Sequence, residues 1–380
     1  PGGATEINPL DALHTNCNKG LIPRSTGGRS GATTVGLFGI FSVVALTLVV
    51  LGTLFLYKWG AAFRAVARVQ SSGAYQGPPE LIATAGLPLV LASVARTVNY
   101  LAIVWPALLF GVLIAGLVRA FLSPRTVTML LGAGAVRQQL VGGVVGMPLM
   151  LCSCCITPVF SSVYARGARL GSSLANMLSS PSLNVAALLL TFLLFPRDMA
   201  LARTAMAIIA VFVLPVLIER LAREEVPSKI LHESACPSEG VLPRNPLGVI
   251  RSWAISSGNV AVTTLPLIVL GVYASGLLVG WFEHPSSVGP STGLVIALVA
   301  LLATLIALPT FFEIPFGLLL LANGFPPGAV LAMLFAGPAI NLPSLFTLAR
   351  VSSRRVALLV FLGVWVTATV GGLLLEVWRR

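Results

Sequence analysis

The 380-residue chain is 56% hydrophobic and 9% charged, and its mean hydropathy is +0.94. Soluble domains carry about 25% charged residues, so the composition excludes a soluble globular protein and predicts an integral membrane protein. The net charge of +12 does not indicate a nucleic-acid-binding protein, because the arginines lie in short loops beside apolar segments instead of forming one basic face.

The apolar segments predict helices rather than a β-barrel. They reach about 20 residues, the length with which a helix crosses roughly 30 Å of hydrocarbon. The sequence lacks the alternating segments of about 10 residues that barrels require. We therefore expect an all-α, polytopic membrane protein with about 8 to 10 membrane segments.

The chain begins with a polar segment, residues 1–33, that is rich in Gly, Ser and Thr. It lacks the basic and then apolar order of a signal peptide, which predicts a flexible tail. Residues 34–95 are expected to contain a peripheral first transmembrane helix, at 34–57, followed by an interfacial linker.

Two transporter repeats, 96–218 and 252–380, are predicted from a motif that occurs twice at an offset of 157 residues. Every spacing within the motif is kept, which indicates a duplicated unit rather than a shared apolar composition. The polar segment 219–251 between the repeats is expected to be a cytoplasmic linker. The first copy comprises Pro158, Gly167, Gly171, Leu174, Ala175, Pro181 and Asn184, and the second comprises Pro315, Gly324, Gly328, Leu331, Ala332, Pro338 and Asn341.

The repeats are expected to contain long spans, two of which are interrupted, at 179–184 and at 336–341. The expected spans are 98–122, 171–195, 200–218, 254–282, 328–348 and 356–377.

Residues 138–165 and 291–323 determine the topology. Each segment is long for one span and short for two. Re-entrant hairpins would make the repeats inverted, whereas single long broken spans would make them parallel. Hairpins place most arginine-containing loops on one face, so the positive-inside rule favours inverted repeats. Prolines interrupt both segments, at Pro148, Pro158, Pro309 and Pro315.

Pro181 with Asn184, and Pro338 with Asn341, are predicted to bind substrate. A proline inside a span leaves a carbonyl without its helical hydrogen bond, and in hydrocarbon such a group needs a partner from protein, water or substrate. Broken helices that meet near the middle of the membrane are the usual construction of a transporter site. The alternative is that these prolines only kink helices that pack elsewhere.

Cys152, Cys154 and Cys155 are the second candidate site. Thiolates are soft ligands, so three of them at a helix break predict contact with a thiophilic substrate. A redox pair and simple packing are the alternatives. A zinc site is not expected, because the three histidines lie in polar segments away from the cluster. With Cys17 and Cys236 the total is five, and an odd number argues against a disulfide scaffold.

Glu313 is the third candidate. It lies in an apolar segment and corresponds to Ile156 of the first copy. A buried carboxylic acid can exchange a proton near neutral pH, which predicts a proton-coupling site. The alternative is a structural glutamate satisfied by Asn341 or by a freed backbone amide. No cofactor is expected, and without a Gly-x-x-x-x-Gly-Lys-Ser/Thr phosphate loop an ATP-driven pump would need a separate subunit.

These residues resemble those of the predicted-permease family that includes the ArsP-type organoarsenical efflux permeases, over about residues 96–378. Two departures from the family pattern stand out: many relatives have glycine in place of Cys155, and the gap between Pro148 and Cys152 is longer than is common. The matching residues are Pro148, Leu149, Cys152, Ser153, Cys154, Pro158, Arg166, Gly167, Gly171, Pro181 and Asn184, with Pro315, Gly324, Gly328, Pro338 and Asn341 in the second half.

The resemblance implies a secondary-active permease rather than an enzyme. It would export trivalent organoarsenicals, such as methylarsenite and reduced aromatic arsenicals, across a bacterial inner membrane, with the three clustered cysteines near the path. Arsenic contact is expected at these cysteines, and proton coupling is expected at Glu313. A permease or channel for another small solute and a membrane thiol–disulfide oxidoreductase are the alternatives. The sequence leaves open the exact substrate, the coupling ion, the direction of transport and the oligomeric state, a homodimer included.

Overall fold

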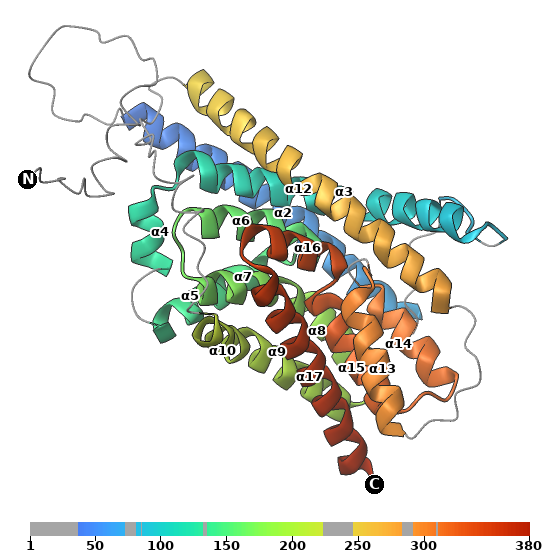
Figure 1. Cartoon of the computed structure of the whole chain (residues 1–380). Coiled ribbons are helices and arrows are strands. Elements are labelled where there is room, and N and C mark those ends of the chain that lie inside the picture. The colour runs from blue at the N-terminus through green and yellow to red at the C-terminus, as the bar shows by residue number, and fades with distance from the viewer. Residues whose placement is uncertain are drawn as a thin grey trace, which may run out of the picture.

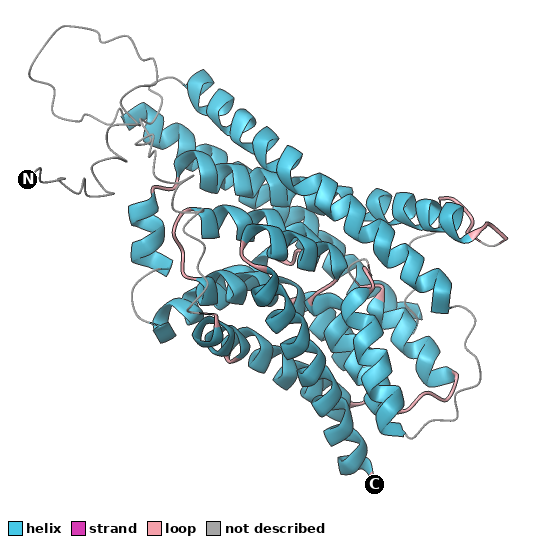
Figure 2. Cartoon of the chain, viewed as in Figure 1, coloured by secondary structure: helices cyan, strands magenta, loops and turns pink. Residues whose placement is uncertain are grey.

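The computed structural model describes residues 37–72, 81–84, 86–131, 135–222, 246–282, 292–308 and 311–380. The described residues form helices joined by short loops, with no strand among them (Figure 2). The predicted tail, most of the predicted linker 219–251 and Pro309 lie outside these ranges.

The helices of the two halves succeed one another along the chain as shown in Figure 1. The first half comprises α2 (Leu37–Ser72), α3 (Leu89–Phe121), α4 (Pro124–Leu131), α5 (Ala135–Gly146), the 3-10 turn η1 (Met147–Leu149), α6 (Ser153–Ala165), α7 (Leu170–Ser182), α8 (Val185–Leu194), α9 (Arg197–Phe212) and α10 (Leu214–Leu221). The second half comprises α12 (Pro246–Phe282), α13 (Thr292–Leu305), α14 (Glu313–Ala322), α15 (Pro327–Ala339), α16 (Leu342–Val351) and α17 (Arg354–Arg379).

Several of these helices can span a membrane. Within the described residues, five spans are long and apolar enough, and the number rises to seven if each of two bent helix pairs is one span. The five lie in α2, α3, α9 with α10, α12 and α17, while α6, α13 and α14 are shorter apolar helices. The prediction of an all-α, multi-pass membrane protein is confirmed.

The bounds of the first two long helices differ from the prediction. α2 continues to Ser72 beyond the expected end at residue 57, because Lys58 lowers the hydropathy without breaking a helix. α3 begins at Leu89, inside the segment expected to be an interfacial linker. Arg96 interrupts the apolar run there, but its guanidinium donates to the backbone carbonyl of Gly276 on α12 at 3.3 Å.

The predicted duplication is visible in the helix bounds. The offset of 157 converts both ends of α7 into those of α15, and both ends of α8 into those of α16. The bend is 41° between α7 and α8 and 45° between α15 and α16. The two breaks therefore occur where the Pro-x-x-Asn motifs predict them, and the inverted orientation of the repeats stays a prediction.

The segments 138–165 and 291–323 are each divided between two helices. α5 and α6 form the first, with η1 between them, and α13 and α14 form the second. The first segment is interrupted at Pro148, within η1, as predicted. The prediction was wrong for Pro158 and Pro315, because α6 continues through Pro158 and Pro315 lies in the first turn of α14. The choice between a hairpin and a single broken span stays a prediction.

Glycines bring the long helices close to the interrupted segments. α3 and α12 pack side by side (Figure 1). A Cβ at Gly111 of α3 would collide with the backbone carbonyl of Cys155, and a Cβ at Gly271 of α12 would collide with the backbone of Pro343. Small residues at such contacts are typical of membrane helices, where van der Waals packing holds the bundle together.

The interrupted helices lie at the centre of the protein. All residues of α7 are buried, as are nearly all residues of α15. In contrast, only 17% of the most apolar window of α2 is buried. The predicted site residues are therefore carried by the most enclosed part of the chain.

Candidate functional site

A narrow internal pocket joins the two halves of the protein. Its cavity volume is about 10 Å³, which is room for about one water molecule. Five of the predicted site residues line it: Cys152, Pro181, Asn184, Glu313 and Pro338, together with Ser153 and Leu308. The predicted residues Cys154, Cys155 and Asn341 are not part of the lining. The structure therefore shows this site in a closed form.

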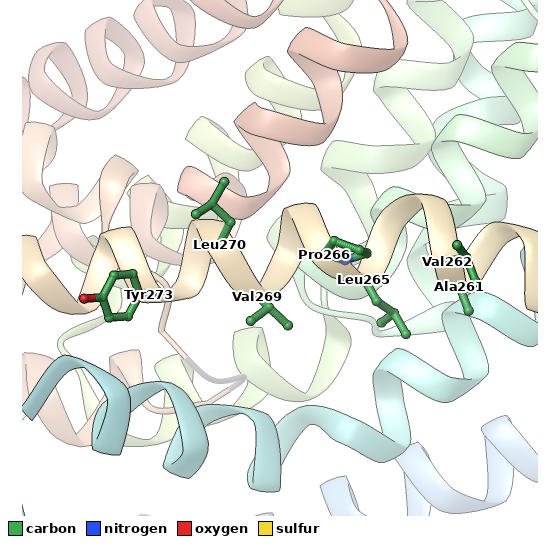
Figure 3. A pocket seen from close by; sticks show the side chains of 7 residues that line it. All are labelled: Ala261, Val262, Leu265, Pro266, Val269, Leu270 and Tyr273. Atoms are coloured by element: carbon green, nitrogen blue, oxygen red, sulfur yellow. The ribbon is translucent and has the colours of Figure 1, made fainter. Parts of the chain in front are cut away.

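A second, larger depression lies along α12 and has different chemistry. It has a volume of about 740 Å³ and is lined by seven side chains of α12, around Pro266 (Figure 3). Six of the seven are aliphatic or proline and Tyr273 is the seventh. Because its lining has no charged group and no cysteine, this groove is suited to contact lipid chains rather than to bind a polar solute.

The three clustered cysteines lie where α6 begins. Cys152 is the N-cap residue, and its sulfur is paired with that of Cys155 in a disulfide whose Cα atoms are 5.2 Å apart. Cys154 is a free, buried thiol. Its Sγ lies 3.2 Å from Sγ of Cys152, 3.7 Å from Sγ of Cys155 and 3.0 Å from the Tyr100 hydroxyl. All three sulfur atoms lie within 4.8 Å of one another.

The asparagines cap the second helix of each broken span. Oδ1 of Asn184 accepts hydrogen bonds from the backbone N–H groups of Ala186 and Ala187, at 3.1 and 3.3 Å. Oδ1 of Asn341 accepts from the N–H of Ser344 at 3.2 Å, and the Ser344 hydroxyl accepts from the N–H of Asn341 at 3.0 Å. Capping satisfies N–H groups that the first turn of a helix leaves without partners. This capping role was not predicted from the sequence.

Capping does not use the side-chain nitrogen Nδ2 of either asparagine. Nδ2 of Asn341 is buried without a hydrogen-bond partner among the described residues. Asn184 lines the pocket while its oxygen caps α8. Substrate contact by these carboxamides stays a prediction, and it is compatible with capping because capping uses only the oxygen atoms.

Glu313 is the first residue of α14 and forms a buried ion pair with Arg203 of α9. Nη2 of Arg203 lies 3.2 Å from Oε1 of Glu313, and the two side chains are 1% and 2% exposed. Nη1 of Arg203 donates a hydrogen bond to the Thr191 hydroxyl on α8. The glutamate is therefore satisfied by an arginine rather than by Asn341.

Arg203 is the functional candidate that sequence reasoning missed. It lies inside the apolar span that was expected at 200–218, where an ionisable side chain is costly unless it has a partner. That cost was an available signal, since a charged residue within a span is by default a candidate for function. Its partner could not be identified, because Glu313 is 110 residues away in sequence.

Two residues with left-handed backbone conformations precede the reactive groups. Met150, with φ of 46°, comes just before the cysteine cluster, and Phe311, with φ of 73°, comes just before Glu313. Met150 forms a small apolar cluster with Ala62 of α2 and Ala186 of α8, and Phe311 packs against that cluster. Non-glycine residues held in this region cost roughly 1 to 3 kcal/mol each and are concentrated at functional sites.

Comparisons with known proteins identify a permease family. The family model described as "Predicted permease" (ArsP_1) matches residues 90–377. UPF0718 protein YraQ of Escherichia coli K12 is 26% identical over 308 residues, which cover 80% of this chain and 86% of that protein. UPF0718 protein MJ0584 of Methanocaldococcus jannaschii is 21% identical over 313 residues, covering 66% and 86%.

No solved structure matches the chain. The matched region runs from the first turn of α3 to the last turn of α17 and includes every residue that lines the pocket. The chain thus belongs to the predicted permease family.

Proposed function

We propose that this permease exports trivalent organoarsenicals, such as methylarsenite and reduced aromatic arsenicals, across a bacterial inner membrane in exchange for protons. The observation that carries the proposal is the cluster of three sulfur atoms within 4.8 Å of one another, one of which belongs to the lining of the pocket. Thiolates bind soft, thiophilic centres, and trivalent arsenic is such a centre.

The sulfur chemistry accounts for reversible binding of an arsenical. With the Cys152–Cys155 pair reduced by a cytosolic thiol, an arsenical R–As(OH)₂ can react with two of the three thiols. Two As–S bonds form, two As–O bonds break, and the two thiol protons leave with the hydroxyls as two water molecules. The remaining thiol can then displace one of the first two, so the arsenic can pass from sulfur to sulfur.

Glu313 supplies the site for the counter-transported proton in this proposal. It lines the same pocket as Cys152. Protonation of Glu313 and binding of the arsenical therefore take place in one small pocket, which is bounded by both halves. The breaks at Pro181 and Pro338 allow the outer parts of the bundle to move around this space, as alternating access requires.

The test is uptake of methylarsenite into everted membrane vesicles under an imposed proton gradient. Replacing Cys152, Cys154 and Cys155 with serine is expected to reduce uptake at least tenfold. The matched control replaces Cys17 and Cys236 with serine, which removes two cysteines outside the cluster and is expected to leave uptake unchanged.

Either of two results contradicts the proposal. Unchanged uptake in the triple variant would mean that the clustered cysteines do not bind the substrate. A lack of methylarsenite uptake by the unmodified protein, under reducing conditions and with an imposed gradient, would mean that the arsenical is not its substrate.

A second function has one specific observation in its favour. Cys152 and Cys155 are spaced as in a Cys-x-x-Cys redox pair at a helix N-terminus, and they form a disulfide with a free thiol 3.2 Å away. Such an arrangement can exchange disulfides with a membrane-embedded thiol partner. A Cys155→Ser variant that accumulates a mixed disulfide with another molecule would favour this oxidoreductase function over transport.

A further inference from the structure

The buried ion pair between Arg203 and Glu313 connects the two halves of the protein. Arg203 lies on α9 and its second hydrogen bond reaches Thr191 on α8, both in the first half. Glu313 begins α14 in the second half. Both charged side chains are almost completely buried, at 1% and 2% exposure. Three helices from the two halves of the chain therefore meet at one pair of charges.

The duplicated unit shows what the fold requires at these positions. The offset of 157 that relates the bounds of α7 to α15 and of α8 to α16 also relates the start of α9 to that of α17. It pairs Arg203 with Val360, Glu313 with Ile156, and Thr191 with Leu348. All three counterparts are apolar and 0% exposed. The same scaffold is therefore built in the other copy without any polar group at these positions.

Stability does not explain the charges. Removing two charges from water costs several kcal/mol per ion, and an apolar pair of similar volume is often as stable or more stable. Since the other copy has buried apolar residues at the matched positions, the ion pair indicates a function rather than a structural need. Ionisable groups inside membrane spans commonly serve ion pathways and proton relays.

Among the described residues, Arg203 is the cation that faces the Glu313 carboxylate. α14 packs mainly against α15 and α8, and neither of these helices contains an ionisable residue. Among the described residues of the pocket lining, Glu313 is the one charged side chain, and Cys152, also in the lining, is held in the disulfide with Cys155. Arg203 itself is not in the lining, so it acts on the pocket through Glu313.

We propose that Arg203 is the positioning residue of the coupling step. It holds the Glu313 carboxylate in its charged form beside the pocket and sets the pH at which Glu313 accepts a proton. This inference rests on the proposed proton coupling. When a proton binds Glu313, the ion pair becomes a cation beside a neutral acid, Arg203 keeps its hydrogen bond to Thr191, and the contact between α9 and α14 is weakened.

The test uses an infrared titration of the full-length protein in lipid, because it needs no substrate. The carboxylic acid band that is absent in Glu313→Gln reports the protonation of Glu313. Arg203→Val is expected to move the midpoint of this titration upward by at least about one pH unit, because an unpaired buried carboxylate is harder to form. Arg203→Lys keeps a positive charge but cannot reach both Glu313 and Thr191 as the guanidinium does, so it is expected to move the midpoint less than Arg203→Val.

Two further variants control for misfolding and for indirect effects. Arg203→Val combined with Glu313→Ile installs the residues found at the matched positions of the other copy, and it is expected to fold while losing proton-dependent transport. Arg197→Val makes the same substitution at an exposed position of α9 and is expected to leave the midpoint unchanged.

The results separate this inference from the proposed function. An unshifted midpoint in Arg203→Val, or proton-dependent transport that persists in the double variant, overturns the role of Arg203. Proton-independent transport by the unmodified protein overturns the coupling itself. A shifted midpoint without methylarsenite uptake overturns the substrate and supports Arg203.

Discussion

The α7–α8 break and the α15–α16 break bend by 41° and 45°, and an asparagine caps the second helix of each. The segments that precede the breaks differ. The first copy has three cysteines ahead of its motif, and the second has Glu313. The comparison teaches that the duplicated part supplies bends and capped helix ends, while the candidate site residues ahead of the breaks differ between the halves. The pocket is where the two contributions meet.

This division explains why the pocket requires both copies. Cys152, Pro181 and Asn184 reach it from the first half, and Glu313 and Pro338 reach it from the second. A site at the interface of two repeats can be opened from either side by moving one half against the other. The closed volume of about 10 Å³ fits an occluded step of such a cycle.

The largest effect is expected from moving the acid to the other half. The double variant Ile156→Glu with Glu313→Ile leaves Arg203 without its carboxylate and buries a new carboxylate on α6. The free energy of unfolding is expected to fall by about 3 to 5 kcal/mol, because breaking a buried pair leaves uncompensated charges. Chemical denaturation in detergent, followed by circular dichroism, measures this change.

The control for that swap moves the arginine as well, with Arg203→Val and Val360→Arg. We expect this four-residue variant to be more stable than the two-residue swap, since the pair can form at the matched position. If the two-residue swap were as stable as the unmodified protein, the two halves would be interchangeable at these positions. That result would contradict the difference between the halves.

An intermediate effect is expected at two glycines of the long helices, Gly111 on α3 and Gly271 on α12. Gly111→Ala and Gly271→Ala each place a Cβ against backbone, at Cys155 and Pro343 respectively. Overpacking of this kind costs about 1 to 3 kcal/mol. Thermal unfolding should show a lower Tm for both variants. Gly258→Ala on α12 is the matched control, because no atom lies within 4 Å of the place that its new Cβ would take.

The two glycine variants also distinguish the halves. Gly111→Ala displaces the backbone of Cys155, so it should reduce arsenical uptake more than Gly271→Ala does at equal loss of stability. An equal loss of uptake in both variants would show that the packing of Cys155 against α3 does not contribute to uptake.

The smallest effect is expected at the helix caps. Asn184→Ala and Asn341→Ala each remove a cap and should lower the free energy of unfolding by about 1 kcal/mol. Asn184→Ser and Asn341→Ser each keep an oxygen acceptor and should recover most of that loss in the free energy of unfolding. Melting curves of the four variants provide the measurement. A loss confined to one asparagine would show that only one of the two breaks depends on its cap.

The sequence predicted the broken spans well because their determinants are local. A proline removes a helical hydrogen bond at its own position, and an asparagine three residues later caps the next helix. The bounds at Leu89 and Ser72 were harder to predict, because hydropathy falls at charged residues that a helix still accommodates. Arg96 is tolerated through a contact with α12 that lies 180 residues away in sequence.

The candidate site was predicted in part. Cys152, Pro181, Asn184, Glu313 and Pro338 were chosen from the sequence, and the structure places all five around one pocket. The pairing of Cys152 with Cys155 and the capping function of the asparagines follow from backbone geometry at the start of each helix. Sequence spacing alone left those outcomes open.

By itself, the sequence determined that this protein is helical, crosses a membrane and contains a duplicated unit with paired breaks. Those properties depend on composition, on apolar length and on residues a few positions apart. Only the tertiary structure decided that Glu313 pairs with Arg203 and that Cys152 of one half shares a pocket with the acid of the other. Such contacts depend on how helices pack across more than a hundred residues, and the local pattern around either partner does not encode the other.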